Sequence, residues 1–341
     1  MANLSTRFLG LTLENPIIAG ASDLTANMDS IKRIEQAGAG AVVLKSLFEE
    51  QVQLERLKLE EDARSGENVY AEMTSIFPKL EHAGPKEHLM WVKKAKEAVR
   101  IPVIASLNAV TQKTWVEYAR LLADQGVDAL ELNFFATPRD FHLSAAHVEE
   151  EQLDAVRSIR QAVSIPIAVK LSMFYSNPLH FMAELDNEGI NGLVLFNRLF
   201  QPDINADSQS MALPFNFSSQ ADNRLPLRFA GLLHGKVKAD VCASTGIMTG
   251  KDIAKMILAG AGTVQVVTAL YRNGVKFLSA MREELDRWMD SKSYANLESF
   301  RGKLSAENAG DPWAYTRAQY AKMMLNPKEF TEPVGAGSAG S

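Results

Sequence analysis

The sequence predicts a parallel (β/α)8 barrel of the α/β class, a TIM barrel, from two recurring strand patterns and the helical segments between them. In the first pattern a glycine precedes an apolar run that stops at a polar side chain, as in residues 38–45, 126–133, 189–197 and 260–268. Glycine in that place is typical of the end of a helix, where a positive φ is needed, and the run after it is typical of a buried parallel strand. The pattern therefore predicts four helix-to-strand units.

The second pattern is an apolar run that begins with proline, as in 15–22, 101–108 and 165–172. Proline is tolerated at the first residue of a strand because its missing N–H lies outside the hydrogen-bonded ladder. The run at 237–243 lacks the proline but completes this set of four. The two patterns alternate along the chain, so together they predict the eight strands of a barrel.

Amphipathic segments of helical period separate these runs. Two connections, 46–85 and 198–223, are longer than the roughly 2–6 residues usual between a strand and its helix. They follow the second and sixth strands, and we expect them to cover the active face. The predicted helices are 27–37, 86–99, 114–125, 146–163, 178–188, 224–233, 250–259 and 270–289, followed by a short C-terminal helical extension at 293–304 and 313–324.

Composition and charge narrow the class of protein. With 46% hydrophobic residues, the 341-residue chain can bury a large core, and we expect one domain over 1–325 and a flexible Gly/Ala/Ser-rich tail over 326–341. The net charge of −5 argues against a nucleic-acid partner. No apolar run is long enough to cross a membrane, and the single cysteine, Cys242, fits a reducing compartment. We therefore expect a cytoplasmic protein.

Polar residues end the predicted strands, which is where barrels of this kind carry their active sites. A lysine flanked by buried apolar residues needs a partner, so the two lysines of this set are strong functional candidates. Lysine, asparagine and hydroxyl groups suit a planar, oxygen-bearing ligand with a phosphate, whereas a metal site would need His, Asp or Glu ligands, and we expect none. The candidates are Gly20, Ala21, Ser22, Lys45, Ser46, Ser106, Asn108, Asn133, Lys170, Ser172, Asn197, Ser244, Thr245, Gly246 and Thr268.

The segments that end the seventh and eighth strands, 243–252 and 266–270, occupy the usual phosphate-binding place in such barrels. Glycine allows a close approach of the backbone, and N–H groups at a helix N-terminus face the anion. The run 246–251 is not a P-loop, because its spacing is one residue short and Asp252 replaces the required Ser or Thr.

These motifs, in this order and spacing, make the chain resemble the dihydroorotate dehydrogenases, in particular the class 1-like branch of dihydroorotate dehydrogenase-like proteins. The likeness covers about 5–290 and is carried by 13–22, 38–46, 130–133, 165–172 and 260–270. It implies an FMN cofactor at the barrel mouth, oxidation of dihydroorotate to orotate in pyrimidine biosynthesis by hydride transfer to the flavin, and a homodimer.

The resemblance also implies roles for individual residues. Lys45 and Lys170 contact the polar edge of the flavin, where a cation stabilises the anionic reduced ring. Lys45 is also a candidate catalytic residue, and Lys45, Asn133 and Asn197 bind the substrate. The implied cofactor-binding residues are Gly20, Ala21, Ser22, Lys45, Ser46, Asn108, Asn133, Lys170, Ser244, Thr245, Gly246, Val267 and Thr268.

Two departures from the family pattern leave the substrate open. Where the dehydrogenases carry a serine or cysteine base shortly after Asn133, an ungapped reading gives Ala136, and alignment of the prolines gives Thr137. Thr137 is the candidate base, although the pKa of an alcohol lies far above 7. In the substrate loop after the second strand, Lys79 stands where asparagine is expected.

Three hypotheses therefore remain: a dihydroorotate-oxidising flavoenzyme, an FMN oxidoreductase of the same fold with a different substrate, and a phosphate-binding lyase or isomerase without flavin. The lone cysteine excludes an intrinsic cysteine-ligated cluster. The sequence does not reveal the electron acceptor, and both a partner subunit and a soluble molecule such as fumarate stay open.

Overall fold

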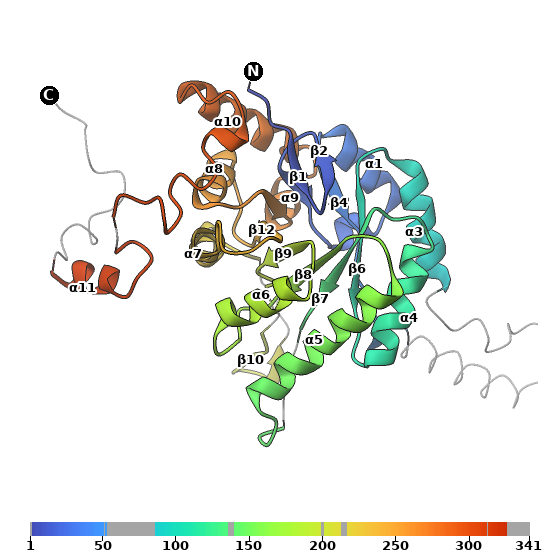
Figure 1. The fold of residues 1–341 in the computed structure, drawn as a ribbon. Coiled ribbons are helices and arrows are strands. Elements are labelled where there is room, and N and C mark those ends of the chain that lie inside the picture. The colour runs from blue at the N-terminus through green and yellow to red at the C-terminus, as the bar shows by residue number, and fades with distance from the viewer. Residues whose placement is uncertain are drawn as a thin grey trace, which may run out of the picture.

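The computed structural model describes residues 2–50, 52, 86–135, 140–198, 201–212, 217–311 and 313–325. Eight parallel strands close into a barrel with helices around its outside (Figure 1). The ring closes because β13 pairs with β3, β3 with β4, and β4 with β6. The predicted fold class is confirmed. The barrel strands are β3 (Ile17–Ala19), β4 (Ala41–Val43), β6 (Val103–Asn108), β7 (Ala129–Asn133), β8 (Ile167–Leu171), β9 (Gly192–Leu195), β12 (Asp240–Ser244) and β13 (Thr263–Val266).

Seven helices between these strands lie within two residues of their predicted bounds. Capping side chains define several of their first turns: Asn27 accepts hydrogen bonds from the N–H groups of Asp29 and Ser30, and Thr111 from that of Thr114. These helices are α1 (Met28–Gln36), α3 (Lys86–Ala98), α4 (Gln112–Ala123), α5 (Ala145–Ala162), α6 (Pro178–Asn187), α7 (Arg224–Leu233) and α8 (Gly250–Ala259). No helix in the described ranges is long and apolar enough to span a bilayer.

The C-terminal helices differ from the prediction. The expected helix 270–289 is two helices, α9 (Thr268–Asn273) and α10 (Phe277–Ser291), because Gly274 takes a φ of +78° between them. The expected helix 293–304 is a short 3-10 turn, η4 (Leu297–Ser299), between left-handed residues at Ser293 and Gly302. Helix α11 (Ala318–Leu325) falls in the second expected segment but begins later. The predicted tail, 326–341, lies outside the described residues.

A hairpin that the sequence analysis did not find closes the N-terminal end of the barrel. Strands β1 (Thr6–Phe8) and β2 (Leu11–Leu13) pair antiparallel, and Phe8, Leu9 and Leu13 join an apolar cluster with inward-facing strand residues such as Ala41, Ala129 and Ala168. Outward-facing strand residues pack instead against the helices in a second, larger apolar core. The hairpin therefore acts as a plug.

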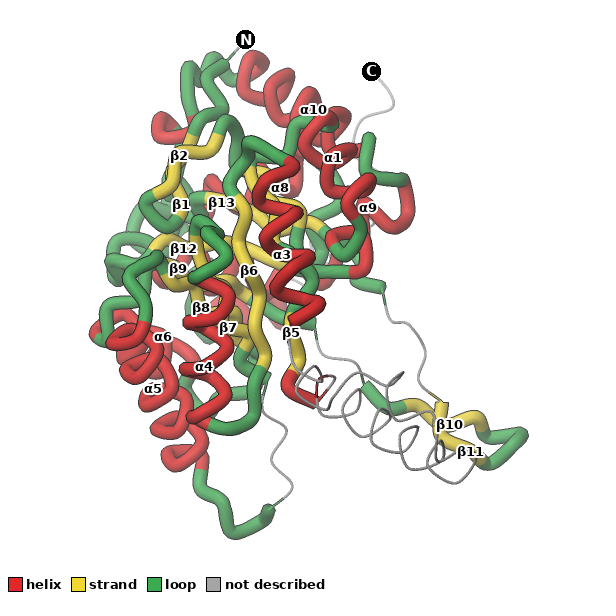
Figure 2. The backbone as a smooth tube through the Cα atoms, turned by 90° about the vertical axis from the view of Figure 1, so that its right-hand side faces the viewer, coloured by secondary structure: helices red, strands yellow, loops and turns green. Residues whose placement is uncertain are grey.

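Both long connections carry short strands where the structure describes them. After β4, β5 (Leu47–Phe48) pairs with β6, and residues 53–85 lie outside the described part. After β9, β10 (Asp203–Asn205) and β11 (Ser210–Ala212) form a hairpin that projects from the barrel (Figure 2). A 3-10 turn, η3 (Gln220–Asn223), then leads into α7.

Candidate active site at the barrel mouth

A cavity of about 390 Å³ lies at the C-terminal ends of the strands. Most of the residues predicted from strand ends line it. Gly20 lies directly behind the wall, because a Cβ there would be 2.8 Å from Cγ2 of Val267. Thr137, the candidate base, and Lys79 lie outside the described residues. The predicted residues that line the cavity are Ala21, Ser22, Lys45, Ser46, Asn108, Asn133, Lys170, Asn197, Ser244, Thr245, Gly246, Val267 and Thr268.

One part of the wall is a hydroxyl cluster made of Ser218, Ser244, Thr245 and Thr268. The Ser218 hydroxyl donates to Oγ1 of Thr268 at 2.9 Å and accepts from the N–H of Gly246 at 3.4 Å. Thr245 takes a left-handed φ of +81°, and its hydroxyl donates to the Phe196 carbonyl at 2.9 Å. The chain after β12 thus folds back tightly on itself at the cavity.

Gly246 is required by this turn on two grounds. Its φ is +75°, a region that side chains disfavour. A Cβ at this position would lie 2.5 Å from the backbone nitrogen of Asn223 and 2.8 Å from the carbonyl oxygen of Ser219. Only glycine lets these two loops come so close.

Asp252 holds together the turn at Gly246 and the loop that contains Asn223, on the side away from the cavity. It is fully buried in the first turn of α8, where Thr249 and Asp252 form a capping box. Its carboxylate accepts hydrogen bonds from the side chains of Gln220 at 2.8 Å and Asn223 at 3.2 Å. Burial alone would raise the pKa of Asp252, but hydrogen bonds from Gln220, Lys255 and Thr249 outweigh it and lower the pKa. The residue that ruled out a P-loop is therefore an anchor of the cavity wall.

Another part of the wall is an asparagine pair. Asn197, after β9, donates from Nδ2 to Oδ1 of Asn133, at the end of β7, over 2.8 Å. Lys45 lies on the same cavity, and its ammonium is 2.6 Å from Oδ1 of Asp23, with side chains 43% and 69% exposed. Sequence reasoning missed Asp23, which gives Lys45 a carboxylate partner.

Lys170 is much more buried than Lys45 and has different partners. Its ammonium donates to Oε1 of Gln265 at 3.0 Å and lies 3.7 Å from the Glu131 carboxylate. Sequence reasoning missed Glu131 and Gln265 as well. The available signal was a charged or amide side chain inside an otherwise apolar strand, since such a group is buried only with partners.

Sequence reasoning also missed three further residues of the wall, Arg198 and Phe217 on loops and Tyr271 in α9. Arg198 lines the cavity and makes an ion pair with Asp222 over 2.9 Å. Phe217 and Tyr271 stack in a tilted arrangement on the cavity. In the described part of the chain, no group of three His, Cys, Asp or Glu side chains is placed to hold a metal ion.

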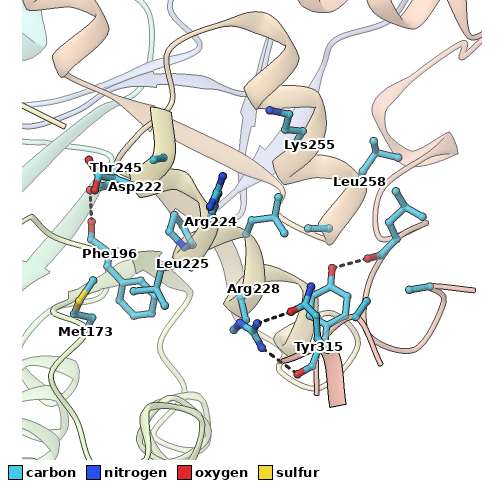
Figure 3. Close-up of a pocket in the computed structure, with 18 of the residues that line it drawn as sticks. Met173, Phe196, Asp222, Arg224, Leu225, Arg228, Thr245, Lys255, Leu258 and Tyr315 are labelled. Carbon is cyan, nitrogen blue, oxygen red and sulfur yellow. Dashed lines mark hydrogen bonds between the residues drawn. The ribbon is translucent and has the colours of Figure 1, made fainter. Parts of the chain in front are cut away.

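A larger groove of about 1270 Å³ lies outside the barrel, between α7, α8 and the C-terminal segment (Figure 3). Apolar side chains such as Leu225 and Leu258 line much of it, and Arg228 binds the Tyr315 carbonyl at 3.2 Å. It meets the mouth cavity at Asn197, Arg198 and Thr245. The mouth cavity, with its lysines, asparagines and hydroxyls, is therefore the candidate active site.

Comparison with known proteins gives matches along most of the chain. The family model for dihydroorotate dehydrogenase matches residues 80–289. The catalytic subunit of dihydroorotate dehydrogenase B (NAD(+)) from Thermoplasma volcanium is 27% identical over 306 residues, covering 89% of this chain and 98% of that protein. A putative dihydroorotate dehydrogenase A (fumarate) from Aeropyrum pernix is 26% identical, covering 88% of this chain and 96% of that protein.

A third relative carries a different name. The NAD-dependent dihydropyrimidine dehydrogenase subunit PreA from Escherichia coli is 23% identical over 321 residues, covering 88% of this chain and 76% of that protein. The family model covers well over half of the chain. The chain therefore belongs to the dihydroorotate dehydrogenase family and is an oxidoreductase of that family.

Proposed function

We propose that this protein is an FMN-dependent oxidoreductase that oxidises a C–C bond of a dihydropyrimidine, with dihydroorotate as the first candidate substrate. The observation that carries the proposal is the division of the mouth cavity into a hydroxyl cluster on one part of the wall and lysines with an asparagine pair on another. A phosphate-bearing planar ligand needs both kinds of wall.

The residues present fit FMN. The cavity volume of about 390 Å³ lies within the roughly 300–1,000 Å³ of ordinary ligand pockets. In the hydroxyl cluster Oγ1 of Thr268 accepts from Ser218, which leaves the hydroxyl proton of Thr268 to donate to a phosphate. The backbone at Gly20 carries no side chain that could hold a flat ring away from the wall. We therefore assign Gly20, Ala21 and Ser22 to the ring, and the turn after β12, with Val267 and Thr268, to the phosphate.

The other wall fits the reaction. When bound, FMN supplies the hydride acceptor. Lys45 and Lys170 place positive charge where negative charge develops on reduction. Asn133 and Asn197 orient each other by their hydrogen bond and carry both donor and acceptor groups, which the imide-like edge of a pyrimidine ring requires.

The proton removed with the hydride needs a base, and we propose Thr137 for this role on its sequence position. Replacing Thr137 by Ala is expected to slow flavin reduction by about 10²–10⁴-fold, the usual contribution of a positioned base. The measurement is anaerobic stopped-flow reduction of the bound flavin. An unchanged rate in T137A would exclude Thr137.

The first experiment separates flavin from no flavin. The purified protein, reconstituted with FMN, is expected to absorb near about 450 nm, as a flavoprotein does. A colourless protein that does not bind FMN contradicts the proposal and favours the phosphate-binding lyase or isomerase.

The second experiment identifies the substrate. Anaerobic addition of dihydroorotate is expected to bleach the flavin. A protein bleached by dihydrouracil and not by dihydroorotate would favour the second enzyme hypothesis. The name of the Escherichia coli relative and the altered base position both support testing it.

The electron acceptor, the oligomeric state and the cellular location of the protein stay predictions. Because relatives carry NAD(+) or fumarate in their names, both belong in a panel of oxidants for the reduced enzyme. Relatives named as catalytic subunits also make a partner subunit a candidate. Light scattering of the purified chain tests the expected homodimer, and fractionation of cells tests the expected cytoplasmic location.

A further inference from the structure

Polar side chains form one buried layer inside the barrel, one step deeper than the asparagines at the mouth. Ser106 and Glu131 lie two residues before Asn108 and Asn133 on their strands, so they face the same interior. Glu131, Ser106 and Gln265 are each about 1% exposed. A carboxylate buried so completely is costly unless other groups compensate it.

The layer is joined by hydrogen bonds from one side of the cavity to the other. The Gln265 amide donates from Nε2 to Oε2 of Glu131 at 2.5 Å and accepts from Lys170 at 3.0 Å. The Ser106 hydroxyl donates to Oε1 of Glu131 at 3.3 Å and lies 2.7 Å from the Ser46 hydroxyl. Glu131 is therefore the centre of a hydrogen-bonded series of five side chains that runs from Ser46 to Lys170.

The two ends of this hydrogen-bonded series line the mouth cavity, and its centre does not. Ser46 and Lys170 line the cavity together with Gln265, whereas Glu131 and Ser106 lie outside its lining. The adjacent interior layer, which includes Cys242, is apolar, so a neighbouring part of the barrel interior is filled without any charge. The buried carboxylate thus points to a task at the cavity.

We propose that Glu131 is a positioning residue for the cofactor. Through Gln265 it fixes the ammonium of Lys170, and through Ser106 it fixes the hydroxyl of Ser46. Its charge also balances that of Lys170, so that Glu131 sets how strongly the cavity favours a reduced, anionic ring. This inference rests on the proposed flavin function.

The decisive variant is Glu131→Gln, which keeps the shape of the side chain and removes its charge. Lys170 then lacks its counter-charge, so the reduction potential of the bound FMN is expected to shift in the positive direction. Lys170→Met is expected to shift it in the negative direction and to weaken FMN binding. The potential is measured by equilibration with reference dyes, and the FMN dissociation constant by fluorescence titration of the apoprotein.

A combined variant tests whether Glu131 acts through Lys170. In the Lys170→Met background Glu131 has no ammonium to position or to balance. Glu131→Gln should therefore shift the potential far less in the Lys170→Met background than in the wild type. Equal shifts in both backgrounds would overturn the coupling of the two residues.

A second variant and a matched control complete the test. If Glu131→Gln fails to fold, Gln265→Met cuts the tether to Lys170 while leaving the carboxylate, and it is expected to raise the FMN dissociation constant and move the potential. Glu283→Gln, on the exposed surface of α10, is the control for the loss of one carboxylate. Its potential and FMN affinity should match the wild type.

The outcomes distinguish the two proposals. If the wild type binds FMN, but Glu131→Gln and Gln265→Met leave both potential and affinity unchanged, the role of Glu131 is wrong and the proposed function stands. If the wild type binds no FMN, both proposals fail. A variant whose thermal stability falls while potential and affinity remain those of the wild type would show a purely structural Glu131.

Discussion

The two ends of the barrel are built from the same eight strands, but one end is lined by apolar side chains and the other by polar ones. At the N-terminal end, small inward residues such as Gly192, Ala129 and Ala168 leave room for the hairpin plug. A Cβ at Gly192 would lie 2.6 Å from Cδ2 of Leu9, so the plug packs directly on the strand. At the C-terminal end, polar side chains surround a cavity.

This difference assigns stability mainly to the plugged end of the barrel and ligand binding to the mouth. The plugged end buries apolar surface, which stabilises the fold at roughly 25 cal/mol per Å². The mouth places lysines, amides and hydroxyls around a space that the protein itself does not fill. Substitutions at the plug should therefore lower stability, and substitutions at the mouth should change ligand binding.

The largest expected effect is at the plug. Phe8 is 1% exposed, and Phe8→Ala is expected to destabilise the protein by about 3–5 kcal/mol, the usual cost of removing a buried phenylalanine. Denaturant unfolding measures the loss. The folded fraction should still bind FMN with wild-type affinity, and a large loss of affinity would show that the two ends are not separable.

The matched control for this variant lies between β7 and α5. Phe141 is fully exposed, so Phe141→Ala is expected to change stability by less than about 0.5 kcal/mol. A loss comparable to that of Phe8→Ala would contradict the assignment of stability to the plugged end.

The next largest effect is expected at the mouth, on FMN affinity. Gly246→Ala is expected to weaken FMN binding by more than about 100-fold, or roughly 2.7 kcal/mol, because the new Cβ would push apart the loops at Asn223 and Ser219. Fluorescence titration of the apoprotein with FMN gives the constant. Gly126→Ala is the control, since Gly126 has a similar φ of +79° but no atom within 4 Å of the added Cβ. Equal affinity in both variants would refute a role for the tight turn.

A smaller effect is expected at Asp252, behind the mouth. Asp252→Asn should cost about 1–3 kcal/mol, since several buried donors lose a charged acceptor. The pKa of Asp252 is lowered in the folded protein, so its contribution is present above the ordinary aspartate range and is lost as pH falls through the lowered pKa. Denaturant unfolding from pH 7 down to pH 3 measures this, and the variant should show a shallower loss on the acid side.

Asp240, at the plugged end, should show the opposite sign. Burial raises its pKa, while hydrogen bonds such as that from the Leu9 N–H at 2.7 Å lower it less. A folded pKa above the unfolded one means that stability decreases as pH rises between the two values. Asp240→Asn should remove that decrease, with exposed Asp290→Asn as the control for both aspartates. Identical pH profiles for Asp240→Asn and Asp252→Asn would contradict this difference between the ends.

The strands were predictable because each buried parallel strand is a continuous apolar run with marked ends. Glycine or proline opened each run but one, and the polar residue that stopped it, such as Asn133 or Thr268, lines the mouth. The plug was not predictable in this way, because each strand of its hairpin has three residues, too short for an alternating pattern.

The partners of the charged site residues could not be predicted from the sequence either. Asp23 and Lys45 are 22 positions apart, and Glu131 and Gln265 are 134 apart, so no local pattern links them. The broken helix at Gly274 was missed because an amphipathic period continues on both sides of a glycine that helices sometimes tolerate.

The smallest expected signal comes from the single thiol, which can report on the two ends separately. Cys242 is fully buried in the apolar cluster beneath the hairpin plug, and burial raises the pKa of its thiol to about 12, so the thiol stays protonated at pH 8. Labelling by a thiol reagent should therefore be slow in the native protein and follow unfolding. Phe8→Ala should accelerate labelling more than Gly246→Ala does, because it destabilises the layer that covers the thiol. Rapid labelling of the native wild type, or faster labelling in Gly246→Ala than in Phe8→Ala, would show that the plugged end opens independently of its apolar packing.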